Sequence, residues 1–334
     1  MLQHSLDLLF FSAKFLIAVI MLLLLLAGVL ALIFRSRGKS PGQLQLTSLN
    51  QKYTDTKEAL FTEILSKEEY KTHKKNLKKK LNDEKKQNFK KNTLFVLNFQ
   101  GDIRATAVSA LREEITAILS VATPQDEVML RLESPGGMVH AYGLATAQLQ
   151  RLRAKGIRLT VIVDKVAASG GYMMACIADQ LIAAPFAIIG SIGVILQMPN
   201  FNRLLKEQHI DFEQITAGRH KRTLTVFGPN TEEGRKKSRE EVEAIHTLFK
   251  QLVQQYRPDT DIDKVTTGEH WSGLESLPLK LIDALGTSDD FLLKQADTWR
   301  LLEVAFQQKK TFMEKFMGAK NQLLNALQTH SLPW

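Results

Sequence analysis

The chain has 334 residues, of which 44% are hydrophobic, 44 are lysine or arginine and 35 are aspartate or glutamate. This size and hydrophobic content suit one large domain with appendages, or two domains, and they exclude a chain that is disordered throughout. The single cysteine, Cys176, excludes an intramolecular disulfide bond and a zinc site built from cysteines.

The formal net charge of +9 comes mainly from one segment. Residues 67–91 contain eleven lysines and four acidic residues, so this segment carries +7 and the rest of the chain only +2. The charge therefore does not indicate a domain that binds nucleic acid, which would gather basic residues on a folded surface.

An apolar segment near the N-terminus, residues 15–34, contains twenty residues without a charge. A helix of that length is about 30 Å long, which matches the hydrocarbon core of a bilayer. A cleaved signal peptide would have a shorter apolar region, followed by small residues at a cleavage site. We therefore expect residues 1–34 to be a retained, single-pass anchor in a lipid bilayer, in preference to a buried core helix.

Two polar segments follow the expected anchor. Residues 35–50 have the composition of a linker, and Arg35, Arg37 and Lys39 favour a cytoplasmic location for the rest of the chain by the positive-inside rule. Residues 51–92 have a helix-forming composition and few core positions, which predicts a solvated helical stalk. The alternative is contact of its lysines with anionic lipid headgroups, favourable by about 1 kcal/mol per lysine near the surface.

From residue 93 onward, strand and helix patterns alternate. This alternation predicts an α/β domain with a mostly parallel sheet. The expected strands are residues 94–99, 127–132, 159–163 and 212–217, and the expected helices are residues 104–120, 139–154, 171–180, 232–256 and 291–327.

A second apolar run, residues 181–198, contains eighteen residues without a charge and could be read as another membrane span. Pro185, Gly190 and Gly193 divide it into short pieces, which is typical of turns. Strands that are covered on both faces also read as continuous apolar runs. We therefore expect buried strands and turns in this run.

Two turns and one lysine are candidates for chemistry. The sequence Ser134-Pro135-Gly136-Gly137 follows an expected strand, and its glycines can expose backbone N–H groups to an anion or an oxyanion. Ser169, flanked by small residues at another strand–helix junction, can be a nucleophile or a helix N-cap. A serine nucleophile needs a base. Lys221 could serve only where burial favours its neutral form, and its neighbours alone favour a basic surface loop.

The order and spacing of four motifs resemble the membrane-bound signal peptide peptidase family of bacterial serine proteases, and within it the SohB branch. That branch has one membrane helix, a charged stalk and one catalytic domain. The resemblance covers essentially the whole chain and is strongest for residues 93–295. The four motifs are Ser134-Pro135-Gly136-Gly137, Ala168-Ser169-Gly170-Gly171-Tyr172, Gly190-Ser191-Ile192-Gly193-Val194 and Lys221-Arg222, with further matches at residues 231–234, 267–273, 281–283 and 285–290.

The resemblance implies an α/β fold of the ClpP/crotonase type, a spiral of ββα units, for residues 93–295. An N-terminal transmembrane helix (residues 1–34) and a charged linker and stalk (residues 35–92) would precede this domain. An amphipathic helical extension (residues 296–334) would follow it. No cofactor and no metal ion are implied.

The resemblance also implies a Ser/Lys dyad. Ser169 would be the nucleophile, Lys221 the general base, and Ser191 would hold the lysine by a hydrogen bond. Backbone amides of Gly136, Gly137 and Gly170 would form the oxyanion hole. His140 and Lys165 also lie near these motifs in the sequence. We expect His140 to be a structural or rim residue, in preference to a partner of Ser169, and Lys165 to be exposed.

The function implied is that of a membrane-anchored serine endopeptidase that cleaves signal peptides or membrane-associated fragments, and that assembles into a homo-oligomer. A crotonase-like acyl-CoA enzyme and a non-catalytic membrane scaffold are the alternatives. The location implied is the bacterial inner membrane. The resemblance favours the periplasmic side for the catalytic domain, whereas the charges that follow the anchor favour the cytoplasmic side.

Overall fold

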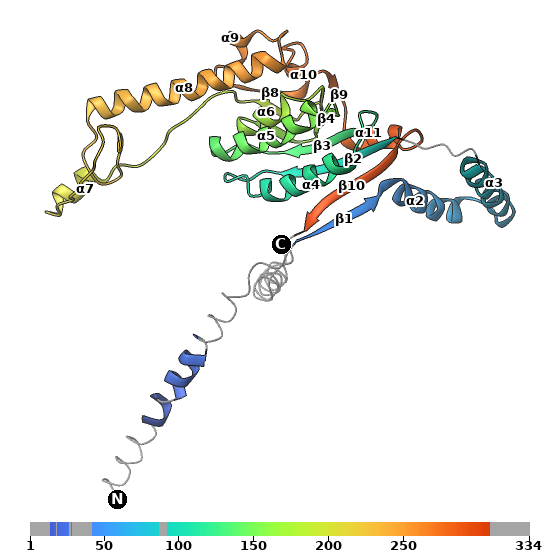
Figure 1. Ribbon diagram of the computed structural model, residues 1–334, viewed down its shortest axis with the longest axis horizontal. Helices are drawn as coiled ribbons and strands as arrows, with labels where there is room; N and C mark the ends of the chain where they lie inside the picture. The colour runs from blue at the N-terminus through green and yellow to red at the C-terminus, as the bar shows by residue number, and fades with distance from the viewer. Residues whose placement is uncertain (1–13, 18, 27, 29–41, 87–91, 308–334) are drawn as a thin grey trace, which may run out of the picture. The chain divides into compact units, whose positions relative to one another are not determined.

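The computed structural model describes residues 14–17, 19–26, 28, 42–86 and 92–307, and residues 44–306 form one compact unit (Figure 1). The expected anchor, residues 15–34, lies partly outside the described residues. Its described parts, residues 15–17, 19–26 and 28, are helical, and large apolar side chains there are exposed. Within the described part of the chain, no helix is both long and apolar enough to cross a membrane.

The compact unit is built on a seven-stranded sheet (Figure 1). From β10 to β9 every neighbouring pair is parallel, as the alternation of strands and helices predicts. The central strands are buried on both faces, which explains their continuous apolar sequences. In spatial order the strands are β1 (Gln43–Ser48), β10 (Arg300–Gln307), β2 (Thr93–Gln100), β3 (Glu127–Glu133), β4 (Arg158–Val163), β6 (Gln180–Ala183) and β9 (Ala284–Leu285).

A second, three-stranded sheet consists of β5 (Val166–Ala168), β7 (Ile188–Gly190) and β8 (His270–Ser272). The chain passes from β4 to β5 and then to α6, and from β6 to β7, so strands of the large and the small sheet follow one another. After β3, an isolated bridge between Ser134 and Ala167 takes the place of the small strand, and α5 follows. The elements thus repeat in the order strand, short strand, helix.

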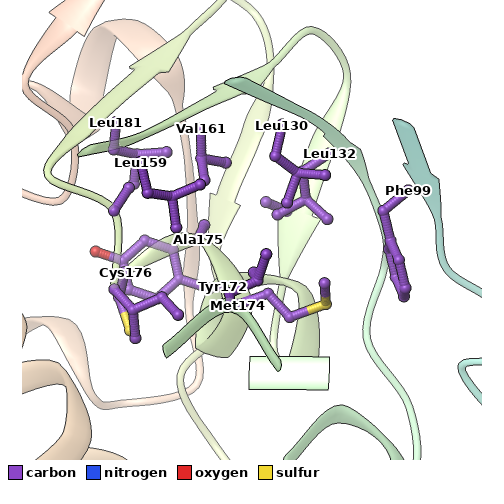
Figure 2. Close-up of a cluster of buried hydrophobic side chains, with 14 of the residues drawn as sticks. Phe99, Leu130, Leu132, Leu159, Val161, Tyr172, Met174, Ala175, Cys176 and Leu181 are labelled. Atoms are coloured by element: carbon purple, nitrogen blue, oxygen red, sulfur yellow. The ribbon is translucent and has the colours of Figure 1, made fainter. Parts of the chain in front are cut away.

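Helices α4 (Val108–Val121), α5 (Val139–Ala154) and α6 (Gly170–Ala175) pack on the large sheet through the main hydrophobic core. Figure 2 shows Leu130, Val161 and Leu181 of the sheet above Tyr172 and Met174 of α6, all of them buried. A second core cluster joins the sheet to α2 (Leu49–Ile64) and α11 (Ser288–Gln295), through Leu49 and Leu292 among others. Both faces of the sheet are therefore covered.

The remaining helices are α3 (Lys67–Lys86), α7 (Asn202–Glu207), α8 (Glu232–Tyr256), α9 (Ile262–Val265) and α10 (Gly273–Ser276). Helices α5 and α8 have the predicted bounds. Thr231 caps α8, accepting a hydrogen bond from the N–H of Gly234, and Phe249 and Val253 bury its apolar face. In the apolar run 181–198, β6 and β7 confirm the prediction of buried strands.

Three secondary-structure predictions are wrong. Residues 43–48 of the expected linker form strand β1, an edge of the large sheet. Residues 300–307 of the expected C-terminal helix form strand β10, and residues 308–334 lie outside the described residues. Residues 212–217, expected as a strand, have no regular structure. Strands β1 and β10 both pair with strands that are far away in the sequence. Such pairing leaves no local pattern in the sequence.

Most of the described part of the expected stalk is helical, and α2, which begins at Leu49 in the expected linker, is attached to the folded domain at its first turn. Asn50 donates a hydrogen bond from Nδ2 to the carbonyl of Ala296 (2.8 Å), and its Oδ1 accepts one from the N–H of Leu301 (2.7 Å). Further along, His73 of α3 lies 3.0 Å from the carboxylate of Glu58 in α2. The two helices therefore contact each other, and α2 starts as part of the domain.

The only cysteine, Cys176, is expected to be chemically inert in the folded protein. Its side chain is buried in the main core, and burial raises the pKa of the thiol to about 12. Because the thiolate is the reactive form, a thiol reagent such as dithionitrobenzoate should not label the native chain and should label it fully in denaturant. Rapid labelling of the native chain, followed by absorbance, would contradict the buried position of α6.

Candidate active site

Ser169 stands between β5 and α6 in a backbone conformation that is unusual for a serine. Its φ is 52° and its ψ is −119°, and its N–H donates to the carbonyl of Gly190 (2.8 Å). A positive φ is disfavoured for a residue with a Cβ, so the surrounding contacts must hold it. The side chain is only partly buried. This local geometry presents a hydroxyl group at a fixed, accessible point, as a nucleophile requires.

The glycine turn, residues 134–137, lies directly beside Ser169. The N–H of Ser134 donates to the carbonyl of Val166, and the N–H of Ala168 donates to the carbonyl of Ser134, at 2.8 and 3.0 Å. Gly136 has a φ of 89°, and a Cβ placed on it would lie 2.8 Å from the Cβ of Ser169 and 2.7 Å from the N of Gly170. Only glycine allows this close approach.

The three predicted oxyanion-hole glycines surround Ser169, but their N–H groups are not equivalent. Gly136 already donates its N–H to Ser134 Oγ (3.1 Å). Gly137 is exposed and packs against the backbone of Ile103, because a Cβ on Gly137 would lie 2.2 Å from the Ile103 carbonyl oxygen. Gly170 is the first residue of α6, where an N–H group has no acceptor within the helix. Gly137 and Gly170 are therefore better placed than Gly136 to donate to an oxyanion.

Ser191 lies next to Ser169 because of strand pairing. The register of β5 and β7 sets Ala168 opposite Gly190, so the residues that follow them are neighbours. Ser191 also has a positive φ, 51°, and its N–H donates to the carbonyl of Glu269. Strand β8 supports this arrangement, since a Cβ on Gly190 would lie 2.8 Å from the ring of Trp271.

Lys221, in contrast, lies on an arm formed by residues 194–231, which include α7. It is exposed, and it is one of the residues around a groove of about 670 Å³. None of the groove's residues comes from β5, α6 or the glycine turn. They are Met198, Phe212, Gln214, Ile215, Thr216, Ala217, Lys221, Arg222, Leu224, Thr225, Val226 and Phe227.

The arm is fastened to the N-terminal part of α8. Ser238 Oγ donates to Thr223 Oγ1 (2.9 Å), and Arg219 lies 3.7 Å from Glu233. The main core is reached only at Phe249, about 16 Å further along the helix axis. Figure 1 shows the same division, with α7 near the start of α8 and α6 near its other half. The structure therefore brings Ser169, Ser191 and the glycines together and keeps Lys221 apart from them within one chain.

Two other polar residues near the motifs are on the surface. Lys165 pairs with Glu133 (3.1 Å) and its side chain is 70% exposed, and His140 is exposed on α5. Sequence reasoning missed Tyr142, whose buried hydroxyl contacts Ser134 Oγ at 2.6 Å. A tyrosine at an apolar position of a predicted helix is interpreted as a core residue. The sequence therefore gives no sign that its hydroxyl group has a role at the site.

Comparison with known proteins assigns this chain to a family. Residues 4–149 match peptidase family S49 N-terminal, and residues 151–301 match peptidase family S49. A probable protease SohB from Haemophilus influenzae is 47% identical over 333 residues, which cover 95% of this chain and 94% of that protein. The chain belongs to peptidase family S49. A peptidase of this family acts on peptide or protein substrates.

Two further comparisons gave one relative by sequence and one solved structure. A probable protease SohB from Buchnera aphidicola is 57% identical over 229 residues, which cover 69% of this chain and 68% of that protein. A solved structure of the 1510-N membrane-bound stomatin-specific protease, a variant in complex with a substrate peptide, is 15% identical. It covers 70% of this chain and 100% of that one, with a TM-score of 0.44.

Proposed function

We propose that this S49 peptidase is a serine endopeptidase in which Ser169 is the nucleophile and Lys221 the general base. The observation that carries the proposal is Ser169 itself, held at a φ of 52° beside Gly136, with Gly170 after it and Ser191 next to it. Membership of a peptidase family favours this function over an acyl-CoA enzyme and over a non-catalytic scaffold. The ClpP/crotonase type remains our proposal for the fold family.

The mechanism follows from these roles. Neutral Lys221 accepts the proton of Ser169 Oγ while that oxygen attacks the carbonyl carbon of the scissile peptide bond. The N–H groups of Gly137 and Gly170 donate to the oxyanion, each worth about 3 kcal/mol in the transition state. Lys221 then gives its proton to the leaving amine, and water hydrolyses the acyl-enzyme. Ser191 orients the ammonium group of Lys221 by a hydrogen bond.

The arm supports a dyad formed between two copies of the chain. Lys221 is exposed in the single chain, whereas a lysine that acts as a base needs burial. Around it the arm exposes large hydrophobic side chains, a pattern typical of a surface covered by a partner. We propose a homo-oligomer in which the arm of one copy brings Lys221 to Ser169 of the next. The exposed side chains are Ile195, Leu196, Met198, Phe201, Leu204, Ile210, Phe212, Ile215 and Phe227.

We also propose that residues 15–34 anchor the protein in the inner membrane. The described helical parts of this segment expose apolar side chains such as Leu22 and Leu24, which lipid would cover. An anchored peptidase would meet signal peptides and membrane-associated fragments at the bilayer. Reporter fusions at the C-terminus test the side of the membrane. Alkaline phosphatase activity would place the catalytic domain in the periplasm, as the family favours. Fluorescence of a green fluorescent protein fusion would place it in the cytoplasm, as Arg35 and Arg37 favour.

Two inactive variants test the dyad together. Ser169→Ala and Lys221→Ala should each lose peptide hydrolysis, and Lys221→Arg should be equally inactive because arginine cannot become a neutral base. When Ser169→Ala and Lys221→Ala are co-expressed with different tags and purified through both, about a quarter of the sites should contain both intact residues and recover hydrolysis.

The matched control is Ser169→Ala co-expressed with itself under the same two tags, which should stay inactive. If the mixed pair also stays inactive, the dyad is not shared between copies. If either variant alone hydrolyses peptides at the parent rate, the proposed dyad is wrong.

A further inference from the structure

A chain of hydrogen bonds runs beneath the glycine turn, from the N–H of Gly136 to the carbonyl of Asp102 in the exposed loop after β2. Ser134 Oγ lies 3.1 Å from the N of Gly136 and 2.6 Å from the Oη of Tyr142, and this Oη lies 2.8 Å from the carbonyl oxygen of Asp102. The side chains of Ser134 and Tyr142 are both fully buried. The chain links the glycine turn to α5 and to the loop after β2.

The direction of each hydrogen bond in this chain is fixed. The Asp102 carbonyl can only accept, so the single proton of Tyr142 Oη points to it. Ser134 Oγ must then donate its own proton to Tyr142 Oη, which leaves a lone pair of Ser134 Oγ to accept the N–H of Gly136. Burial raises the pKa of the Tyr142 hydroxyl, so it stays protonated. Removing the tyrosine hydroxyl leaves the Ser134 proton without this acceptor.

The ring of Tyr142 packs against Gly170, the first residue of α6. A Cβ placed on Gly170 would lie 2.5 Å from Cγ of the Tyr142 ring, so the backbone of Gly170 rests on that ring. A Cβ on Gly101 would lie 2.4 Å from both Ser134 Oγ and Tyr142 Oη, which leaves no space around the pair of hydroxyls. Tyr142 therefore contacts Gly170 with its ring and controls Gly136 through its hydroxyl.

We propose that Tyr142 is a positioning residue for the oxyanion hole: through Ser134 it holds the turn of Gly136 and Gly137, and through its ring it holds Gly170. The inference rests on the proposed function, because it assigns a task to the amides of Gly137 and Gly170. The Tyr142 hydroxyl forms its hydrogen bonds with Ser134 and Asp102, and none with Ser169 in the described part of the chain. It fixes the distance between two donors that belong to different segments of the chain.

The test separates positioning from stability. Tyr142→Phe keeps the ring under Gly170 and removes only the hydroxyl, so we expect kcat for a peptide substrate to fall about ten- to hundredfold with KM unchanged. The matched control is Tyr172→Phe, which removes another buried hydroxyl, one that donates to the carbonyl of Leu281 (2.9 Å). The control should lower the thermal midpoint similarly and leave kcat at the parent value.

A second variant covers the case in which Tyr142→Phe does not fold. Ser134→Ala breaks the same chain at its middle and should lower kcat to the same extent, and the double variant should lose no more than the more impaired single variant. Parent kcat in either variant, with only the thermal midpoint lowered, overturns the inference and leaves the peptidase proposal standing. If the parent protein shows no peptide hydrolysis that is lost in Ser169→Ala, both the inference about Tyr142 and the peptidase proposal are overturned.

Discussion

Ser169→Ala is expected to lower kcat for peptide hydrolysis by about four to six orders of magnitude. Alanine has no hydroxyl group with which to form the acyl-enzyme, and the oxyanion donors alone retain only a small part of the rate enhancement. The substitution keeps the Cβ and the N–H that donates to the Gly190 carbonyl, so the positive φ is supported as before. Initial rates on a fluorogenic peptide, with the thermal midpoint measured in parallel, provide the readout.

Two serine variants calibrate this result. Ser109→Ala, on the exposed surface of α4, removes a hydroxyl that donates to the Thr106 carbonyl and should leave kcat unchanged. Ser191→Ala removes the group that we propose orients Lys221, and it should give an intermediate loss, about ten- to hundredfold. A Ser169→Ala protein that keeps the parent rate would show that another residue is the nucleophile.

The residues around Ser169 could be predicted from the sequence because the backbone there depends on residue type. A glycine is required where a Cβ would clash with another chain segment, as at Gly136. Such required glycines can be recognised in the sequence as parts of motifs. The same motifs also contain Ser191, which lies next to Ser169 because parallel pairing of β5 and β7 brings the residues after two short strands together.

The position of Lys221 could not be predicted in the same way. Its loop was expected to follow a strand, whereas residues 212–217 have no regular structure and the arm depends on contacts with α8. The surface that we propose a second copy covers consists of exposed apolar residues, which resemble core residues in a sequence. Ile215, 97% exposed, is an example.

Strand β10, which lies between β1 and β2 in the large sheet, escaped prediction for a different reason. Residues 300–307 follow α11 closely in the sequence. The apolar residues of the two segments, taken together, recur at helical spacing, so the sequence predicts one long helix. The strand is set by its parallel register with β2, in which Leu301 lies opposite Leu94. That partner is about two hundred residues away in the chain, and no local pattern records it.

Arg257→Met is expected to lower the free energy of unfolding by about 3 kcal/mol. Arg257 follows α8, and its side chain is 7% exposed. Its Nη1 donates to both oxygens of Asp283 at 2.8 Å, and its Nε and Nη2 donate to the carbonyls of Cys176 and Ala178 at 3.1 Å. Methionine fills much of the volume but leaves the carboxylate and two carbonyls without these donors.

The size of the effect follows from where these acceptors lie. The Cys176 and Ala178 carbonyls follow α6, and Asp283 also accepts the N–H of Leu181 at the start of β6 (2.6 Å). The guanidinium group therefore joins the ends of α6 and α8 to the large sheet. Lysine could not replace it, because one ammonium group does not reproduce the planar set of donors.

Urea unfolding of the full-length chain in detergent, followed by far-ultraviolet circular dichroism, measures this loss. Arg235→Met is the control, since Arg235 forms only an exposed pair with Glu232 (3.4 Å) within the same helix and should change the free energy of unfolding by less than about 0.5 kcal/mol. If Arg257→Met proves too unstable to purify, Asp283→Asn keeps an acceptor for Leu181 and should give a smaller loss. Equal stability of the Arg257→Met and Arg235→Met proteins would show that the guanidinium group does not tie α6 to the sheet.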